Sequence, residues 1–184
     1  MSVPARGSPV NPHPRFQVLE FEVDPDALDF DLLHGEQIEP RTRFLRDDSR
    51  TVISSNTSPD IPFDRSLNPY RGCEHGCSYC YARPGHEYLG MSAGLDFERL
   101  ILVKENAASL LAAELRRPSW QPQLLMLSGV TDPYQPVERH LGITRACLQV
   151  LLEFRNPVGI ITKNHLVTRD IDILTELARL GLVT

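Results

Sequence analysis

Short apolar runs alternate with amphipathic segments over the last two-thirds of the chain. The runs at residues 100–103, 124–127 and 158–162 are typical of buried strands. Apolar residues recur every three or four positions over residues 106–117 and 144–154, which predicts helices. Strands that are apolar on both faces and alternate with amphipathic helices indicate a parallel sheet covered by helices.

A further helix is expected after Thr168, which we take as its N-terminal cap, with an apolar stripe that includes Ile171 and Leu177. Residues 182–184 begin another apolar run where the chain stops. Such units build (β/α) barrels, so we expect an α/β fold with a partial barrel that is truncated after about three βα units. A partial barrel leaves an unpaired sheet edge, and we therefore expect either a fragment or a protein completed by a partner.

The first third of the chain has a different character. More than half of the 15 prolines precede Phe63, and proline interrupts both helices and sheet ladders. We therefore predict that residues 1–64 form a proline-rich, partly irregular extension, with no helix or strand before about residue 50 and a short strand at residues 51–54. Residues 65–184 are then the core domain.

Polar loops follow three of the predicted strands. A strand at residues 66–70 leads into a cysteine-rich loop, residues 128–135 follow the second strand, and residues 162–165 follow the third. In folds of this kind the chemistry lies where strands end and loops begin. We expect all three loops to face one cavity.

Three of the four cysteines, Cys73, Cys77 and Cys80, are crowded into the first of these loops. This is a poor disulfide framework and a good metal or iron–sulfur motif. Structural zinc usually takes four ligands, whereas three thiolates suit a [4Fe–4S] cluster with one iron open to a small molecule. We favour the cluster, and zinc completed by His75 or His86 is the alternative.

Other polar residues allow both a structural and a functional interpretation. Cys147 lies on the apolar face of its predicted helix and is expected to be a packed core thiol. Asp132 precedes a proline and suits either a turn or a ligand. Arg71 and Arg83 flank the cysteines and could meet an anionic substrate, while Lys163 either contacts a carboxylate or is solvated.

Charge and hydropathy exclude some classes of protein. The net charge of −5 does not support a general nucleic-acid-binding surface, although it leaves room for a local groove. The first residues contain no apolar segment that could serve as a signal peptide, and no apolar run is long enough to span a bilayer. We expect a cytoplasmic protein without a membrane partner.

The cysteine loop carries a recognisable motif. Cys73, Cys77 and Cys80 form CxxxCxxC, and the aromatic Tyr79 precedes the last cysteine. Together with Asn-Pro-Tyr-Arg-Gly-Cys before it and Thr-Asp-Pro-Tyr-Gln-Pro at 131–136, this pattern resembles the radical S-adenosylmethionine superfamily, in the branch of spore photoproduct lyase-like and related uncharacterised proteins. The resemblance covers about residues 65–184.

The resemblance implies a radical S-adenosylmethionine enzyme of lyase or oxidoreductase type, with an unknown substrate. In the superfamily a reduced [4Fe–4S] cluster passes an electron to S-adenosylmethionine, which yields methionine and a 5′-deoxyadenosyl radical that abstracts hydrogen from the substrate. A reductant such as flavodoxin or ferredoxin is the implied partner. The alternative is a non-catalytic iron–sulfur or zinc protein, or an inactive fragment that serves as an interaction module.

The same resemblance implies roles for individual residues. Cys73, Cys77 and Cys80 would hold the cluster, and Tyr79 would lie near the adenine. Residues 128–132 occupy the place of the family's glycine-rich motif, which contacts the methionyl amino group, although Gly-Gly-Glu is absent there. The implied cofactor contacts in this segment are Ser128, Gly129, Thr131 and Asp132. No catalytic residue beyond the cluster ligands is implied.

Overall fold

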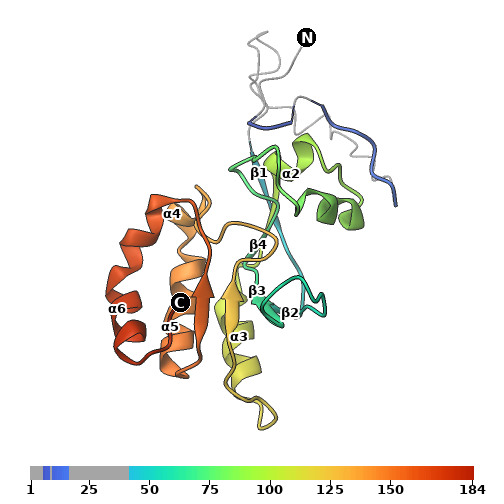
Figure 1. Cartoon of the computed structure of the whole chain (residues 1–184). Coiled ribbons are helices and arrows are strands. Elements are labelled where there is room, and N and C mark those ends of the chain that lie inside the picture. The colour runs from blue at the N-terminus through green and yellow to red at the C-terminus, as the bar shows by residue number, and fades with distance from the viewer. Residues whose placement is uncertain (1–5, 9, 17–41) are drawn as a thin grey trace.

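The computed structural model describes residues 6–8, 10–16 and 42–184 and has a mixed α/β architecture (Figure 1). Its strands form a four-stranded sheet in the order β2-β3-β6-β7 and a three-stranded sheet in the order β1-β5-β4. The strands are β1 (Arg43–Arg46), β2 (Ile53–Ser55), β3 (Arg65–Leu67), β4 (Tyr70–Arg71), β5 (Leu100–Val103), β6 (Leu125–Leu127) and β7 (Val158–Ile160).

The four-stranded sheet contains the predicted parallel unit. Strand β6 lies between β3 and β7 and is parallel to both, while β2 pairs with β3 in the antiparallel direction. Val183 forms an isolated parallel bridge with Val158, so the apolar run at residues 182–184 continues the order of the sheet beyond β7.

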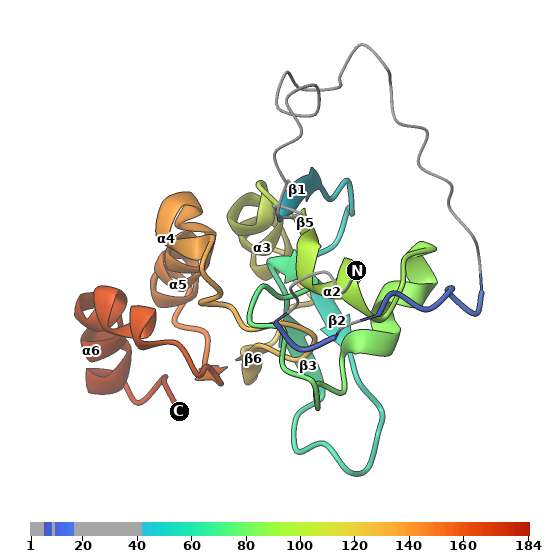
Figure 2. The same ribbon diagram turned by 90° about the horizontal axis from the view of Figure 1, so that it is seen from above.

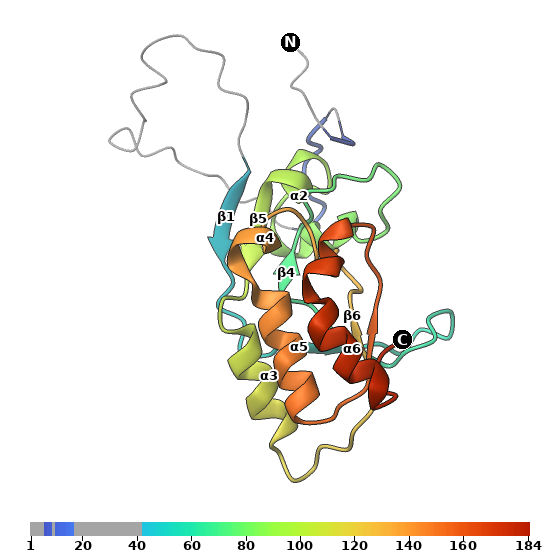
Figure 3. The ribbon, with the colours of Figure 1, turned by 90° about the vertical axis from the view of Figure 1, so that its left-hand side faces the viewer.

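Three helices cover one face of this sheet. Figure 3 shows α3, α5 and α6 side by side, with α5 packed against both of the others. Leu67 and Leu127 from the strands and Leu111, Leu151 and Leu177 from the helices are fully buried between the layers. The α-helices are α2 (Leu95–Arg99), α3 (Ala107–Leu115), α4 (Glu138–Leu141), α5 (Ile143–Glu153) and α6 (Ile171–Arg179), and the 3-10 helices are η2 (Arg83–Leu89) and η3 (His165–Asp170).

The predicted partial (β/α) barrel is wrong, although the α/β class holds. The described strands divide between two mixed sheets, and neither sheet closes into a barrel. The strand expected at residues 66–70 splits at Pro69, which has no N–H to donate to a ladder, into β3 and β4 in different sheets. Strand β5 then pairs with β1 and β4 and not with β3.

Three local predictions also need correction. The chain before residue 50 was expected to lack strands, but Phe44 and Leu45 lie in β1, which pairs in parallel with β5. Asp170, and not Thr168, caps α6, because the Thr168 hydroxyl donates within η3 to the His165 carbonyl. The buried face of α6 is Ile173 and Leu177, while Ile171 is exposed.

Residues 6–8 and 10–16 of the N-terminal extension pack against α2 and η2 (Figure 2). The backbone N–H groups of Arg6 and Gly7 donate to the Glu98 carboxylate at 3.0 and 3.2 Å. Arg15 forms an ion pair with Glu87 at 2.5 Å. The rest of the predicted extension, at 1–5, 9 and 17–41, lies outside the described residues. Among the helices that the structure does describe, none has the length and apolar character needed to cross a bilayer.

Candidate functional site

The loops after β4, β6 and β7 meet around one cavity of about 260 Å³, here named the first cavity. We name these segments the cysteine loop (residues 72–83), the second loop (residues 128–137) and the third loop (residues 161–165). The prediction that all three loops face one cavity is therefore confirmed. The lining residues are Cys73, His75, Cys77, Tyr79, Cys80, Tyr81, Ala82, Ser128, Val130, Thr131, Asp132, Ile161, Thr162 and Lys163.

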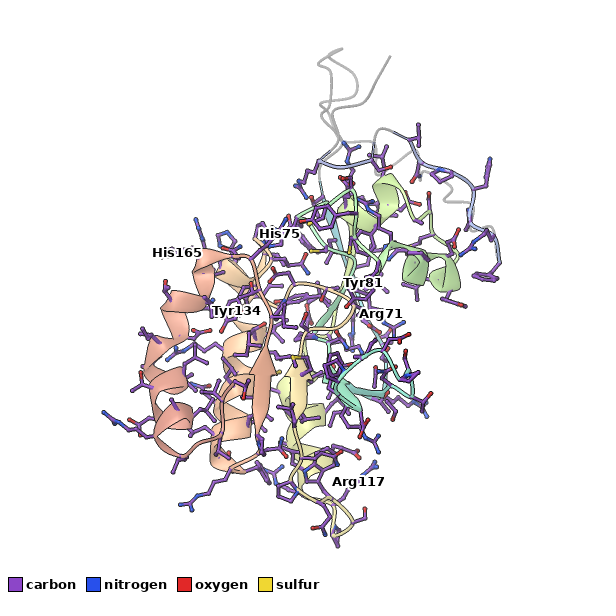
Figure 4. The ribbon with its side chains drawn as sticks, viewed as in Figure 1. Arg71, His75, Tyr81, Arg117, Tyr134 and His165 are labelled. Carbon is purple, nitrogen blue, oxygen red and sulfur yellow. The ribbon has the colours of Figure 1, made fainter. Side chains whose placement is uncertain are left out.

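Figure 4 shows how this end of the molecule is arranged. The labelled side chains of His75, Tyr134 and Tyr81 lie toward the end of the sheet where the three loops meet, whereas Arg117 lies at the opposite end. This is the carboxyl end of the parallel strands β6 and β7, where ligands bind in α/β sheets.

The cysteine loop is wound by successive tight turns. The N–H of Gly76 donates to the carbonyl of Cys73, and that of Cys80 to the carbonyl of Cys77, both at 3.2 Å. Gly76 adopts a φ of +61°, and a Cβ atom there would lie 2.8 Å from the Glu98 carboxylate. A side chain at this position is therefore excluded both by conformation and by space.

Arg83 fixes the backbone of the cysteine loop through hydrogen bonds. Its buried guanidinium donates to the carbonyls of Gly76 and Cys77, both at 2.9 Å, and forms an ion pair with Glu98 at 2.6 Å. Glu98 is itself almost completely buried. Arg83 thus holds the backbone that carries the cysteines, and it does not line the first cavity. The prediction that it could meet a substrate is not favoured by this placement.

The second loop is hydrogen-bonded to the cysteine loop through the side chain of Gln135. The amide oxygen of Gln135 accepts from the N–H of Glu74 at 2.9 Å, and its amide nitrogen donates to the Gly72 carbonyl at 3.4 Å. Gln135 is fully buried, and these two contacts lie on either side of Cys73. The position of Cys73 is therefore fixed from two sides.

Asp132 ties the three loops together. Its carboxylate accepts from the Tyr134 N–H at 2.8 Å, the Thr162 hydroxyl at 2.6 Å and the Lys163 N–H at 3.0 Å. His75 Nε2 from the cysteine loop lies 3.3 Å from the same carboxylate. Burial raises the pKa of Asp132, but these contacts outweigh burial and hold the pKa below its usual value. Asp132 is thus a structural link, and a contact to a cofactor stays a prediction.

The charge state of the thiols depends on their surroundings. Burial raises the pKa of Cys73 to about 11, so an empty site keeps this thiol protonated near neutral pH. Lys163 Nζ lies 2.8 Å from the sulfur of Cys77, and this hydrogen bond raises the pKa of Lys163. The contact thus brings a positive charge to one of the three candidate cluster ligands.

A cluster and a single metal ion need different arrangements of their ligands. Among the residues that the structure describes, no three His, Cys, Asp or Glu side chains are grouped as ligands of one metal ion would be. A zinc ion holds each sulfur at about 2.3 Å and therefore needs its ligands tightly grouped. A [4Fe–4S] cluster binds each thiolate at a different iron, so three thiols spread around one cavity can hold it.

The remaining predicted site residues take different positions. Tyr79 lines the first cavity and is 85% exposed, and Ser128 and Thr131 also line it. Gly129 does not line the cavity, and its carbonyl accepts a hydrogen bond from the Tyr81 hydroxyl. His86, the other candidate zinc ligand, is also absent from the lining.

Several side chains are structural. Cys147 is fully buried on α5, as predicted. Tyr134 is fully buried and donates to Asp170 at 3.1 Å, whereas Tyr81 is largely exposed. The interlocking roles of Arg83, Gln135 and Thr162 were not expected. Each acts across at least two loops or elements, and no local pattern indicates such a contact.

Comparison with known proteins finds relatives without an assigned activity. The chain is 42% identical over 119 residues to uncharacterised proteins of Mycobacterium bovis and Mycobacterium tuberculosis, which covers 65% of this chain and 35% of each relative. It is 30% identical over 110 residues to an uncharacterised protein of Methanocaldococcus jannaschii, or 60% of this chain and 39% of the relative. The chain thus spans little more than a third of the length of these relatives. No family model and no solved structure matches it.

Proposed function

We propose that this chain carries the cofactor site of a radical S-adenosylmethionine enzyme whose substrate is unknown. Cys73, Cys77 and Cys80 hold a [4Fe–4S] cluster, and S-adenosylmethionine lies beside it in the first cavity. When bound, the cluster supplies the electron that cleaves S-adenosylmethionine into methionine and a 5′-deoxyadenosyl radical.

One observation carries this proposal. All three cysteines of the CxxxCxxC motif line a single cavity together with the loops that follow the next two parallel strands. A structural metal site needs only its ligands, whereas a cofactor site also needs room for a small molecule. The cavity of about 260 Å³ beside the thiols provides that room.

The residues of the chain position and shield the cofactor. Lys163 places its ammonium 2.8 Å from the sulfur of Cys77. Asp132 joins the second loop to the third through its bonds to Thr162 and Lys163, and its carboxylate lies 3.3 Å from His75 of the cysteine loop. Val130 and Ile161, which are both partly exposed, give the cavity an apolar wall.

The proposal includes a cellular context. A reductant such as flavodoxin or ferredoxin supplies the electron, because none of the protein side chains at the site does so. Such reductants act in the cytoplasm, where thiols also stay reduced, and we place this protein there. The net charge of −5 gives no support to a nucleic-acid substrate.

Zinc is the second candidate, because His75 lines the same cavity as the three cysteines and could complete a Cys₃His set. Iron, sulfide and zinc content after anaerobic reconstitution separates the two. The proposal expects four irons and four sulfides per chain, which is the composition of the [4Fe–4S] cluster. One tightly held zinc that iron does not displace would instead support the structural metal site.

A further inference from the structure

A second cavity, also of about 260 Å³, lies next to the first. Ala82 and Val130 line both cavities, so they form a shared wall. The remaining wall of this second cavity comes from β2, β4 and the residues on either side of it, η2, α2 and the residue after β5. Nothing in the proposed cofactor site uses it.

A buried lysine stands in this second cavity. Lys104 follows β5, and its side chain is only 6% exposed. Its ammonium donates to the Thr51 carbonyl at 3.2 Å and lies 3.9 Å from Asp47. An ammonium has three N–H donors, so the described contacts leave donor capacity for a ligand. Burial lowers the pKa of Lys104, which marks the position as unfavourable for a lysine unless an anion approaches.

Arg71 adds a second positive charge. The guanidinium forms an ion pair with Asp47 at 3.1 Å and donates to the Ser49 hydroxyl at 2.7 Å. One carboxylate thus serves both Arg71 and Lys104. No Asp or Glu is among the residues that line the cavity in the described part of the chain. The site therefore has an excess of one positive charge.

The opposite side of the cavity is apolar. Leu89 and Phe97 line it, and Tyr88 lies at its edge with 75% exposure. His86 also lines the cavity, and its Nε2 donates to the Leu100 carbonyl at 3.0 Å. Burial lowers the pKa of His86, so the imidazole is neutral near pH 7 and does not add to the charge. Two cations at one side and an apolar surface at the other suit an amphipathic anion.

We propose that the second cavity binds a small organic anion, whose carboxylate or phosphate lies against Lys104 and Arg71 and whose apolar body lies against Leu89 and Phe97. The shared wall places this anion beside the cofactor cavity. The role of the anion as the substrate to be attacked rests on the proposed function, whereas its binding does not.

Binding is measured by calorimetric titration of the full chain with phenyl phosphate, benzoate and phenol in a buffer of low ionic strength. We expect one of the two anions to bind and phenol to bind at least about tenfold more weakly, since a hydrogen bond to a charged group is lost. The stronger anion identifies the head group. Equal binding of phenol, or no binding of either anion, would overturn the proposal.

Variants of the lining residues show which cavity binds the anion. Lys104→Gln and Arg71→Gln are expected to weaken the anion about tenfold. Asp47→Asn removes the carboxylate that competes for both cations and is expected to tighten binding. Lys163→Gln is the matched control, because Lys163 lines only the first cavity. If Lys163→Gln abolishes binding and Lys104→Gln does not, the anion lies in the first cavity and the proposal fails.

A further test uses the wild-type protein and so does not depend on the folding of any variant. In nitrogen-15 spectra the amide signals of Gly72 and Gly85, which line the second cavity, should shift on addition of the anion. Shifts confined to Thr131 and Thr162, which line the first cavity, would contradict the proposal. None of these measurements requires iron or S-adenosylmethionine, so their failure leaves the proposed function untouched.

Discussion

Lys163 Nζ lies 2.8 Å from the sulfur of Cys77, although the two residues are 86 positions apart in the chain. The contact joins the loop after β7 to the cysteine loop after β4, and it brings a cation to a thiol inside an apolar cavity. Together with the carboxylate of Asp132, which binds both of these loops, it makes the cysteine loop part of a three-loop site.

The three loop cysteines should each be needed for iron. Cys73→Ala, Cys77→Ala and Cys80→Ala are expected to lose the brown colour and charge-transfer absorption of the reconstituted protein, because each removes one thiolate. Cys147→Ala is the matched control, since this thiol is buried on α5 and should affect stability only. Iron content that persists in the Cys77 variant would rule out the assignment.

His75 distinguishes the cluster from zinc. His75 lines the first cavity but lies 3.3 Å from Asp132, and in the cluster model it is not a ligand. His75→Ala should therefore keep its iron and its visible absorption, as measured after anaerobic reconstitution. A variant that loses all bound metal would instead support a Cys₃His site.

Removal of the Arg83 side chain should disorder the cysteine loop. Arg83→Met leaves Glu98 as a buried carboxylate without its ion-pair partner, which is expected to lower the free energy of unfolding by about 3–5 kcal/mol. Denaturant unfolding measures this change. Arg65→Met is the control, because Arg65 bonds only an exposed serine hydroxyl and its loss should change stability little. If the two variants had equal free energies of unfolding, Arg83 would not stabilise the fold as described.

Asp132 should stabilise the fold in a pH-dependent way. Its pKa is lower in the folded chain than in the unfolded chain, so its contribution is fully present above the unfolded value of about 4 and is lost as the pH falls through the folded value. Asp132→Asn should be less stable than wild type at pH 7, and the difference should shrink below about pH 4. A difference that is constant with pH would show that the charge does not contribute.

Asp132 should also affect the cofactor. Because it fixes the second and third loops, Asp132→Ala is expected to weaken S-adenosylmethionine binding while iron content is kept. Equilibrium dialysis of the reconstituted variant measures both. Unchanged affinity would limit Asp132 to its role in the loops.

Local pattern predicted the elements of the fold but not their assembly. The apolar runs at β5, β6 and β7 and the helices α3 and α5 lie where periodicity placed them, because burial follows from local sequence. The partial barrel failed because strand pairing is a long-range property. Pro69 redirects the chain between β3 and β4. Strand β5 pairs with β1, which lies in the part of the chain where the many prolines led us to expect no strand.

The candidate site was predicted in part for the same reason. Cys73, Cys77 and Cys80 are close in sequence, so their shared cavity could be expected from spacing alone. The hydrogen bonds that hold the loops join residues that are distant in the sequence. Gln135 accepts from Glu74, 61 positions away, and Thr162 donates to Asp132, 30 positions away. No sequence motif or periodic pattern marks a glutamine or a threonine as a residue that will hold two loops together.

The central claim is that the three-cysteine cavity activates S-adenosylmethionine. Its most direct test is the incubation of the reconstituted, dithionite-reduced chain with S-adenosylmethionine under anaerobic conditions, followed by measurement of 5′-deoxyadenosine and methionine. The proposal predicts both products in equal amounts, and neither product from the Cys77→Ala variant. An intact cluster that yields no 5′-deoxyadenosine would contradict the claim.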